Sequence, residues 1–310
     1  MPVIYGLDKI KEPFKNAAIS LGNFDGVHLG HQTLFRELMK RAVAVKGDAV
    51  VITFDPHPLA LLKPELAPGI ITPLDRKTEL ILSYGLDYVL VIPFTREFAK
   101  IGAREFVKDI LFEKLGMKEL IVGYDYAFGR NREGNIDLLK AMGQELGFAV
   151  HVLDAIHRGD SLISSTAIRN LLREGNVARV NEMLARPFQV SGKIMTGRRV
   201  GGAVLGFPTA NLDSSEMGMI PAKGVYAVEA VLDEVVLPGV CNVGVNPTFN
   251  EQRLTVEVHI FDFDRDIYGQ TMRVNFIERL RDERKFQSVE ELAEQINKDA
   301  KKARIILNLS

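Results

Sequence analysis

Apolar and polar residues alternate in two different ways along this chain, and the first pattern extends to about residue 185. Nearly continuous apolar runs rich in valine and isoleucine predict strands that are buried on both faces. Segments of helical periodicity separate these runs, so this half is expected to form a parallel sheet with helices on both sides. The predicted strands span residues 17–22, 48–54, 87–94, 119–123 and 148–153, and the predicted helices lie near 31–45, 74–84, 103–115 and 134–146.

The pattern changes after the segment "LARPF" at residues 184–188. Short strand-like stretches follow one another between Gly, Pro, Asn and Asp turns, which is typical of an antiparallel barrel, and one amphipathic helix is expected at about 288–307. We therefore predict an α/β domain over residues 1–185 and an all-β domain with a C-terminal helix over residues 186–310, with Pro187 near the boundary. The predicted barrel strands span residues 188–195, 224–232, 234–245, 253–261 and 270–277.

Composition adds limits to this picture. A length of 310 residues favours two domains. Because 39 basic residues nearly balance 40 acidic ones, no overall positive field would gather nucleic acid or anionic lipid. The single cysteine, Cys241, excludes an intramolecular disulfide and suits a reducing compartment. With no apolar leader and no run long enough to cross a bilayer, a cytoplasmic location is expected.

The stretch "LGNFDGVHLGHQTL" at residues 21–34 joins the first predicted strand to the first predicted helix. Glycines in such a turn let the backbone approach a phosphate, and His28 and His31 flank a helix start whose N–H groups attract anions. Two other interpretations stay open on these residues alone. Asp25 and the two histidines have ligand types that bind zinc, and Asn23 and Asp25 are also common in a purely structural turn.

The sequence "HLGH" matches the HxGH signature of the nucleotidylyltransferase superfamily, and "GNFDGVHLGH" resembles bacterial bifunctional riboflavin kinase/FAD synthetases. The segment "LISSTAIRNLL" at 162–172 has hydroxyl residues suited to an N-cap and an arginine suited to phosphate. It resembles the ISSTxIR element of that family, which binds the nucleotide phosphates. The resemblance implies catalytic roles for His28 and His31 and ATP contacts from Gly22, Asn23, Phe24, Asp25, Gly30, Ser164, Ser165, Thr166 and Arg169.

Two further segments, "TFDPHP" at 53–58 and "VGYDYAFGRNREG" at 122–134, follow predicted strands, where ligands bind in open α/β sheets. Taken alone, the first segment predicts a rigid turn in which His57 is a weak candidate for chemistry. The family resemblance implies that both contribute to the ATP and flavin pocket. It favours Asp125 and Phe128 as flavin contacts, although the family commonly has GxDFxFG where this chain has tyrosines around Asp125.

In the second half, "LGFPTANL" at 205–212 places Thr209 and Asn211 two residues apart, on one side of an extended segment. Their hard oxygen atoms suit a magnesium ion bound with a nucleotide, whereas a polar turn is the plainer interpretation. The segment resembles the PTAN signature of flavokinases, which implies that both residues hold the magnesium of ATP. In "VEVHIFDFDRDIYG" at 256–269, Glu257 and His259 share one strand face, and the family's general base corresponds to Glu257.

The acidic run at 262–273 superficially matches a calcium-binding loop. It has Ile267 where the loop needs glycine and Arg273 where it needs a bidentate glutamate, so a turn between strands is predicted. The segments "NVGVNPTF" at 242–249 and "RLRDERKF" at 279–286 also resemble flavokinases; the second implies flavin contacts for Arg279, Arg281 and Glu283. The chain departs from the family at Ala203, where an arginine is usual, and Arg198 or Arg199 is a candidate to replace it.

The resemblance implies a Rossmann-like adenylyltransferase domain followed by a flavokinase barrel. Together they would phosphorylate riboflavin to FMN and transfer an adenylyl group from ATP to FMN, with magnesium as cofactor. The expected partners are therefore small molecules rather than nucleic acid or membrane, and the expected state is a monomer or weak oligomer. Two alternatives are a non-catalytic flavin or nucleotide sensor and a nucleotidylyltransferase joined to an RNA-binding barrel. No GxxxxGK[ST] motif occurs, which excludes a P-loop kinase.

Overall fold

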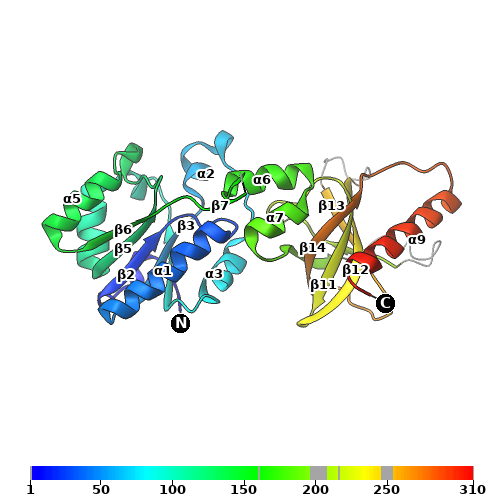
Figure 1. The fold of residues 1–310 in the computed structure, drawn as a ribbon, viewed down its shortest axis with the longest axis horizontal. Coiled ribbons are helices and arrows are strands. Elements are labelled where there is room, and N and C mark those ends of the chain that lie inside the picture. Colours follow the sequence, from blue (N-terminus) through cyan, green and yellow to red (C-terminus); the bar gives the residue numbers. More distant parts are fainter. Residues whose placement is uncertain (1, 160, 196–207, 216, 246–253, 310) are drawn as a thin grey trace. The chain divides into compact units, whose positions relative to one another are not determined.

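The computed structural model describes residues 2–159, 161–195, 208–215, 217–245 and 254–309. The chain forms two compact units, the first comprising Met1–Pro68 and Leu74–Ser164 and the second comprising Gly69–Pro73 and Ser165–Ser310 (Figure 1). The split falls about 20 residues before the boundary that the sequence suggests. It does so because the two helices that follow Ser164 pack with the barrel; Asn181 of the second helix donates from Nδ2 to the Phe276 carbonyl at 2.8 Å.

The first unit is a six-stranded parallel sheet with the strand order β1-β4-β3-β2-β5-β6. Helices cover both faces, and alternate residues of the central strand serve two separate cores. Ala17 and Ile19 pack against α4, its π-helical continuation η4 and α5, whereas Ala18 packs against α1 and α3. The elements are β1 (Val3–Tyr5), β2 (Ala17–Leu21), α1 (Leu29–Val45), β3 (Ala49–Asp55), α2 (Pro58–Leu62), α3 (Leu74–Leu82), β4 (Tyr88–Pro93), α4 (Ala103–Glu105), η4 (Phe106–Lys114), β5 (Met117–Gly123), α5 (Ile136–Leu146) and β6 (Ala149–Leu153).

The strand order explains where a ligand can bind in this unit. β3, β4 and β1 extend from one side of β2, and β5 and β6 extend from its other side, so the order reverses at β2. Ligands of open parallel sheets bind beyond the carboxyl ends of the strands at such a switch point. The turn that begins at Gly22 leaves β2 at this position, which confirms that the glycine-rich stretch follows the first long strand.

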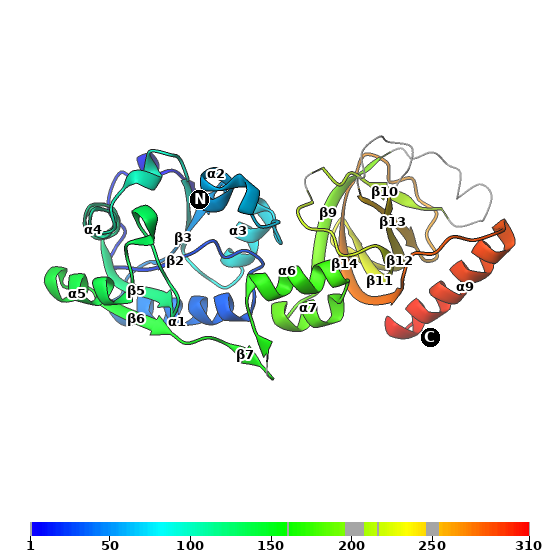
Figure 2. The same ribbon diagram turned by 90° about the horizontal axis from the view of Figure 1, so that it is seen from above.

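The second unit contains a closed antiparallel barrel with the strand order β10-β13-β12-β11-β14-β9 (Figure 2). Side chains alternate between a buried inner face and a more accessible outer face, as in Val256, Glu257 and Val258. The predicted fold class, α/β followed by all-β, is confirmed. The elements are β7 (His157–Arg158) and β8 (Ser161–Leu162), which still belong to the first unit, and then α6 (Ser165–Glu174), α7 (Val177–Leu184), β9 (Phe188–Met195), β10 (Ala210–Leu212), β11 (Gly224–Leu232), β12 (Val235–Val245), β13 (Leu254–Ile260), β14 (Thr271–Arg281) and α9 (Val289–Ile306).

None of the helices in the described part of the chain combines the length and the hydropathy of a membrane span.

Candidate active sites

The turn between β2 and α1 is tightly folded, with three residues at positive φ. Phe24, Gly26 and Val27 have φ values of 48°, 87° and 45°. The Phe24 ring lies over Gly22, where a Cβ atom would come within 3.0 Å of the ring carbon Cζ. Phe24 and Asp25 are only 2% and 7% exposed. Gly22 therefore allows the turn to close, and Phe24, which the sequence suggested as an ATP contact, places its ring in the core.

His28 and His31 meet at the start of α1. His28 is the N-cap of the helix, since its Nδ1 accepts a hydrogen bond from the His31 backbone N–H at 3.4 Å. The two imidazole rings are stacked with their centroids 3.6 Å apart. A neutral imidazole that accepts at Nδ1 carries its proton on Nε2 and can donate it to an anion. Two donors at a helix N-terminus fit the phosphate-binding role that the sequence predicts.

Gly30 lies between the histidines for a steric reason. A Cβ atom at this position would lie 3.1 Å from Cε1 and 3.2 Å from Nδ1 of His28, and 4.0 Å from the Ile163 carbonyl oxygen. The contact with Ile163 shows that the segment leading to Ser164 passes beside the start of α1. Gly30 thus leaves room both for the His28 ring and for this segment.

Lys77 of α3 is a part of the site that the sequence analysis missed. Its Nζ donates to the Asn23 carbonyl and to Thr53 Oγ1, both at 3.1 Å, and the residue is 8% exposed. Burial lowers the pKa of Lys77, while the negative charges of Asp25 and Asp55 act in the opposite direction. A signal exists in the sequence, because Lys77 lies four residues before the buried Ile81, on the apolar face of its helix.

Asn23 is also contacted through its side chain. Its amide nitrogen lies 3.0 Å from His57 Nε2, and His57 Nδ1 accepts the Leu59 backbone N–H at 3.1 Å as the N-cap of α2. His57, a weak candidate on the sequence alone, therefore supports the turn from the neighbouring β3–α2 connection.

The other residues predicted for the first site differ in burial, and they belong to different units. Ser164 precedes α6, while Ser165, Thr166 and Arg169 belong to the second unit and stay predicted phosphate contacts. Arg169 is 8% exposed, and its Nε donates to the Gly69 carbonyl at 2.7 Å. In the first unit Asp125 is exposed beyond β5, whereas Phe128 is buried and its ring stacks on Tyr126 with centroids 5.6 Å apart.

Three polar residues lie in one row across the outer face of the barrel. Glu257 of β13 pairs with Asn211 of β10 on one side and with Asn242 of β12 on the other. Cross-strand partners point to the same side of a sheet, so the carboxylate lies between two amides. The flanking residues of each strand are buried, whereas these three are half-buried. Asn242 lies in a segment that resembled the family but was not itself predicted as a site residue.

The carboxylate of Glu257 is electrostatically unusual. Burial raises the pKa of Glu257, and the nearby negative charge of Glu283 raises it further. Glu283 lies against β12, since a Cβ atom at Gly244 would come within 2.7 Å of its Oε1 atom. A raised pKa makes a carboxylate a stronger base once it is ionised, which suits the proton acceptor that the sequence predicts.

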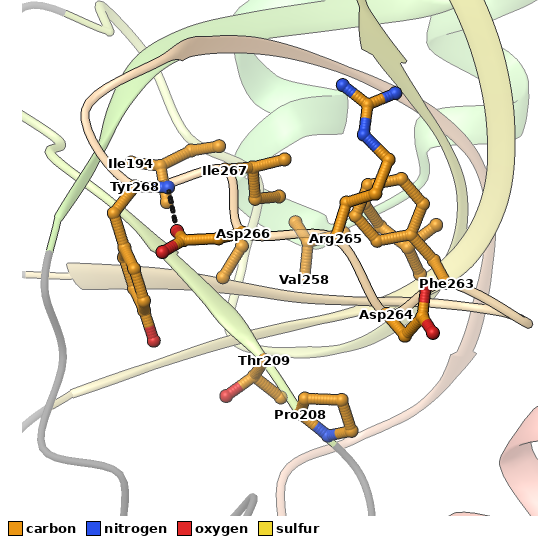
Figure 3. Close-up of a pocket in the computed structure, with 12 residues that line it drawn as sticks. Ile194, Pro208, Thr209, Val258, Phe263, Asp264, Arg265, Asp266, Ile267 and Tyr268 are labelled. Atoms are coloured by element: carbon orange, nitrogen blue, oxygen red, sulfur yellow. Dashed lines mark hydrogen bonds between the residues drawn. The ribbon is translucent and has the colours of Figure 1, made fainter.

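A pocket of about 270 Å³ lies beside Thr209 (Figure 3). The turn after β13 forms much of its wall, and within this turn the Tyr268 backbone N–H donates to Asp266 Oδ1 at 3.0 Å. Nδ1 of His259 contacts the Pro208 carbonyl oxygen at 2.8 Å, which ties Thr209 to β13. The acidic run is therefore a turn, as predicted. Apolar and polar residues both line the pocket, and they include Pro208, Phe263, Asp264, Ile267 and Tyr268.

Of the predicted flavin contacts in this unit, two have structural partners. Arg279 donates to the Glu174 and Lys223 carbonyls at 3.3 and 2.6 Å. Arg281 forms an ion pair with Asp299 of α9, with its Nε 2.9 Å and 3.1 Å from the two carboxylate oxygens. The flavin roles of Arg279, Arg281 and Glu283 stay predictions. Arg198, Arg199 and Ala203, together with residues 246–249, lie outside the described residues.

Within the described residues, no group of three or more His, Cys, Asp or Glu side chains is arranged to hold a metal ion. The first site is a turn whose hydrogen-bond donors suit a phosphate. The second is a carboxylate of raised pKa on a strand between two amide side chains. They define the class of two-domain phosphotransferases that act on nucleotides.

Comparison with known proteins places the chain more narrowly. Residues 10–167 match the family model described as FAD synthetase, and residues 184–307 match the one described as riboflavin kinase. A bifunctional riboflavin kinase/FMN adenylyltransferase of Escherichia coli strain K12 is 38% identical over 312 residues, covering 100% of this chain and 99% of the relative. That of Pseudomonas fluorescens is 35% identical over 307 residues, covering 99% and 98%.

A crystal structure described as that of a macrolide-efflux protein from Streptococcus pneumoniae shares the fold, with a TM-score of 0.89 and 32% identity over 98% of this chain and 99% of the other. That description concerns the other protein. The chain belongs to the bifunctional riboflavin kinase/FMN adenylyltransferase family, and its two halves are the two transferase domains in the family's order.

Proposed function

We propose that the chain makes FAD from riboflavin in two steps, with the phosphorylation at the Glu257 row and the adenylyl transfer at the β2–α1 turn. Riboflavin is the first substrate, FMN the intermediate and FAD the product. The observation that carries the kinase assignment is the row of Asn211, Glu257 and Asn242, which register places side by side on three adjacent strands of the barrel. A sensor that only binds flavin needs no half-buried carboxylate at this position.

In the first step, Glu257 accepts the proton of the 5′-hydroxyl of the ribityl chain as that oxygen attacks the γ-phosphorus of ATP. A new oxygen–phosphorus bond forms, the bond to the β–γ bridging oxygen breaks, and ADP leaves with the bond electrons. Thr209 and Asn211 supply the hard oxygen atoms that would hold magnesium. Both are half-buried; Thr209 lines the pocket, and Asn211 pairs with Glu257. Bound there, the ion would neutralise phosphate charge.

In the second step, an FMN phosphate oxygen attacks the α-phosphorus of another ATP, and pyrophosphate leaves. A phosphate is already a nucleophile, so the protein must mainly align the reactants and stabilise negative charge. His28 and His31, the N-terminus of α1 and the backbone of the turn supply donors for this purpose. Ser164, Ser165, Thr166 and Arg169 are further proposed phosphate contacts.

The test follows flavins by chromatography after incubation with riboflavin, ATP and magnesium. Glu257→Gln should abolish FMN formation and leave FAD formation from supplied FMN intact, whereas His28→Ala should do the reverse. The assignment of one step to each site is wrong if either variant is still folded but loses both activities. A cytoplasmic location, the absence of nucleic-acid and membrane partners and a monomeric or weakly oligomeric state stay predictions from the sequence.

A further inference from the structure

Lys77 is a buried lysine that neither transfer step, as proposed, uses directly. It lies on α3, between β3 and β4, whereas the turn that leads to the histidines follows β2. Lys77 is only 8% exposed. Lysine is rarely buried, because its ammonium group loses hydration that only good hydrogen bonds replace. An apolar side chain of similar length would fill this position at lower cost, so the retained charge needs a reason.

The contacts of Lys77 converge on one carbonyl group. Nζ donates to the Asn23 oxygen and to Thr53 Oγ1, both at 3.1 Å. Thr53 Oγ1 in turn donates to the same Asn23 oxygen at 3.2 Å. The three groups form a closed triangle that joins β3 and α3 to the turn. The positive charge faces Asp25 and Asp55, which raise its pKa against the effect of burial.

This triangle fixes the first peptide of the strained part of the turn. A trans peptide is planar, so holding the Asn23 carbonyl toward Lys77 directs the Phe24 N–H the opposite way. Phe24 itself has a φ of 48°, a conformation that side chains other than glycine adopt at a cost. His28 lies only four residues after Phe24. A rotation of the Asn23–Phe24 peptide would therefore displace the imidazole rings of the histidine pair.

We propose that Lys77 is a positioning residue for adenylyl transfer, which holds the Asn23–Phe24 peptide and through it the histidine pair. It acts on the backbone and does not touch the reacting atoms. The inference rests on the proposed location of adenylyl transfer in this unit. Because one chain carries both activities, its riboflavin kinase activity serves as a built-in control for protein quality.

The experiment measures FAD formation from supplied FMN and ATP, and in parallel FMN formation from riboflavin, for Lys77→Met. We expect kcat for FAD formation to fall about 10²-fold, the loss typical of a displaced catalytic geometry. KM for FMN and the kinase rate should stay close to wild type. Thr78→Val is the matched control. It removes a buried hydroxyl that donates to the Asp75 carbonyl at 2.9 Å on the same helix, without a contact to Asn23, and should keep the wild-type kcat.

A second pair of variants decides the matter if Lys77→Met fails to fold. Thr53→Val removes one corner of the triangle while keeping the side-chain size, and Thr53→Ser keeps the hydroxyl. The proposal expects a lower kcat for the valine variant and a wild-type kcat for the serine variant. It is overturned if folded Lys77→Met or Thr53→Val keeps the wild-type kcat, or if Thr78→Val loses as much as Lys77→Met. If wild-type protein makes no FAD from FMN, the proposed function fails instead.

Discussion

Replacing Gly30 with alanine should separate stability from adenylyl transfer. The new Cβ atom would lie 3.1 Å from Cε1 and 3.2 Å from Nδ1 of His28. The optimal separation of two non-bonded carbon atoms is about 3.5–4.0 Å, so the His28 ring or the start of α1 must move by roughly 0.4 Å. His31 already stacks on the His28 ring with centroids 3.6 Å apart, which restricts the directions open to that movement.

Two opposite effects follow from this displacement. A shift of about 1 Å in a catalytic group costs about 10²-fold in rate, so about 0.4 Å should lower the FAD-forming rate by roughly tenfold. Alanine is a better helix former than glycine by about 0.5–1 kcal/mol, and Gly30 lies in the first turn of α1 with no positive φ to forbid a side chain. The variant is therefore expected to be no less stable than the wild type.

The assay compares initial rates of FAD formation from supplied FMN, rates of FMN formation from riboflavin and thermal unfolding midpoints. Gly102→Ala is the matched control. Gly102 is the N-cap of α4 in the first unit and has a φ of −69°. A Cβ atom there would lie 3.4 Å from its nearest neighbour, Glu133 Oε1, which is an ordinary van der Waals distance. This variant should keep both activities. A Gly30→Ala protein that makes FAD at the wild-type rate would refute the steric reason given for this glycine.

The remaining predictions concern the barrel unit. Asp299→Ala leaves Arg281 without its carboxylate; because the Arg281 side chain is 20% exposed, we expect the low end of the buried-pair cost, about 3 kcal/mol or roughly 9 °C in the unfolding midpoint. Calorimetry with Glu294→Ala, which removes an exposed ion pair on the same helix, provides the comparison and should show almost no change. Glu283→Gln removes a like charge that raises the pKa of Glu257, so the base stays ionised to lower pH. The acidic limb of the pH profile of FMN formation should shift to lower pH. An unchanged limb would contradict the electrostatic effect of Glu283 on Glu257.

The periodicity of the sequence predicts most of the fold because long buried strands and amphipathic helices leave strong patterns. The central strand is expected at 17–22 and observed at Ala17–Leu21, and the last helix is expected at 288–307 and observed at Val289–Ile306. Short elements leave too few residues for a pattern, so β1 and α2 were missed. The packing of α6 and α7 with the barrel depends on tertiary contacts, which local periodicity does not encode.

The sequence predicts less of the candidate site than of the fold. Motif resemblance points to Glu257 and the histidines, and the register of β13 places Glu257 beside Asn211. Lys77 was missed because a lysine in an amphipathic helix is normally solvated, and only the position of Asn23 reveals what it binds. The flavin contact of Arg281 stays a prediction; its partner Asp299, 18 residues away on α9, could not be foreseen, because sequence periodicity predicts that helix but not what it packs against.

The two sites are organised by different physical means, and this difference determines how each responds to substitution. In the first unit the donors depend on a strained backbone turn, so residues that never meet a nucleotide, such as Lys77, affect the histidines through the chain. In the barrel, pairing between strands already fixes the row of Glu257 and its two amides, because backbone hydrogen bonds set the register. Substitutions in the row should therefore act locally, on the proton transfer or on the bound phosphates. Distant substitutions that spare stability should impair adenylyl transfer far more often than phosphorylation.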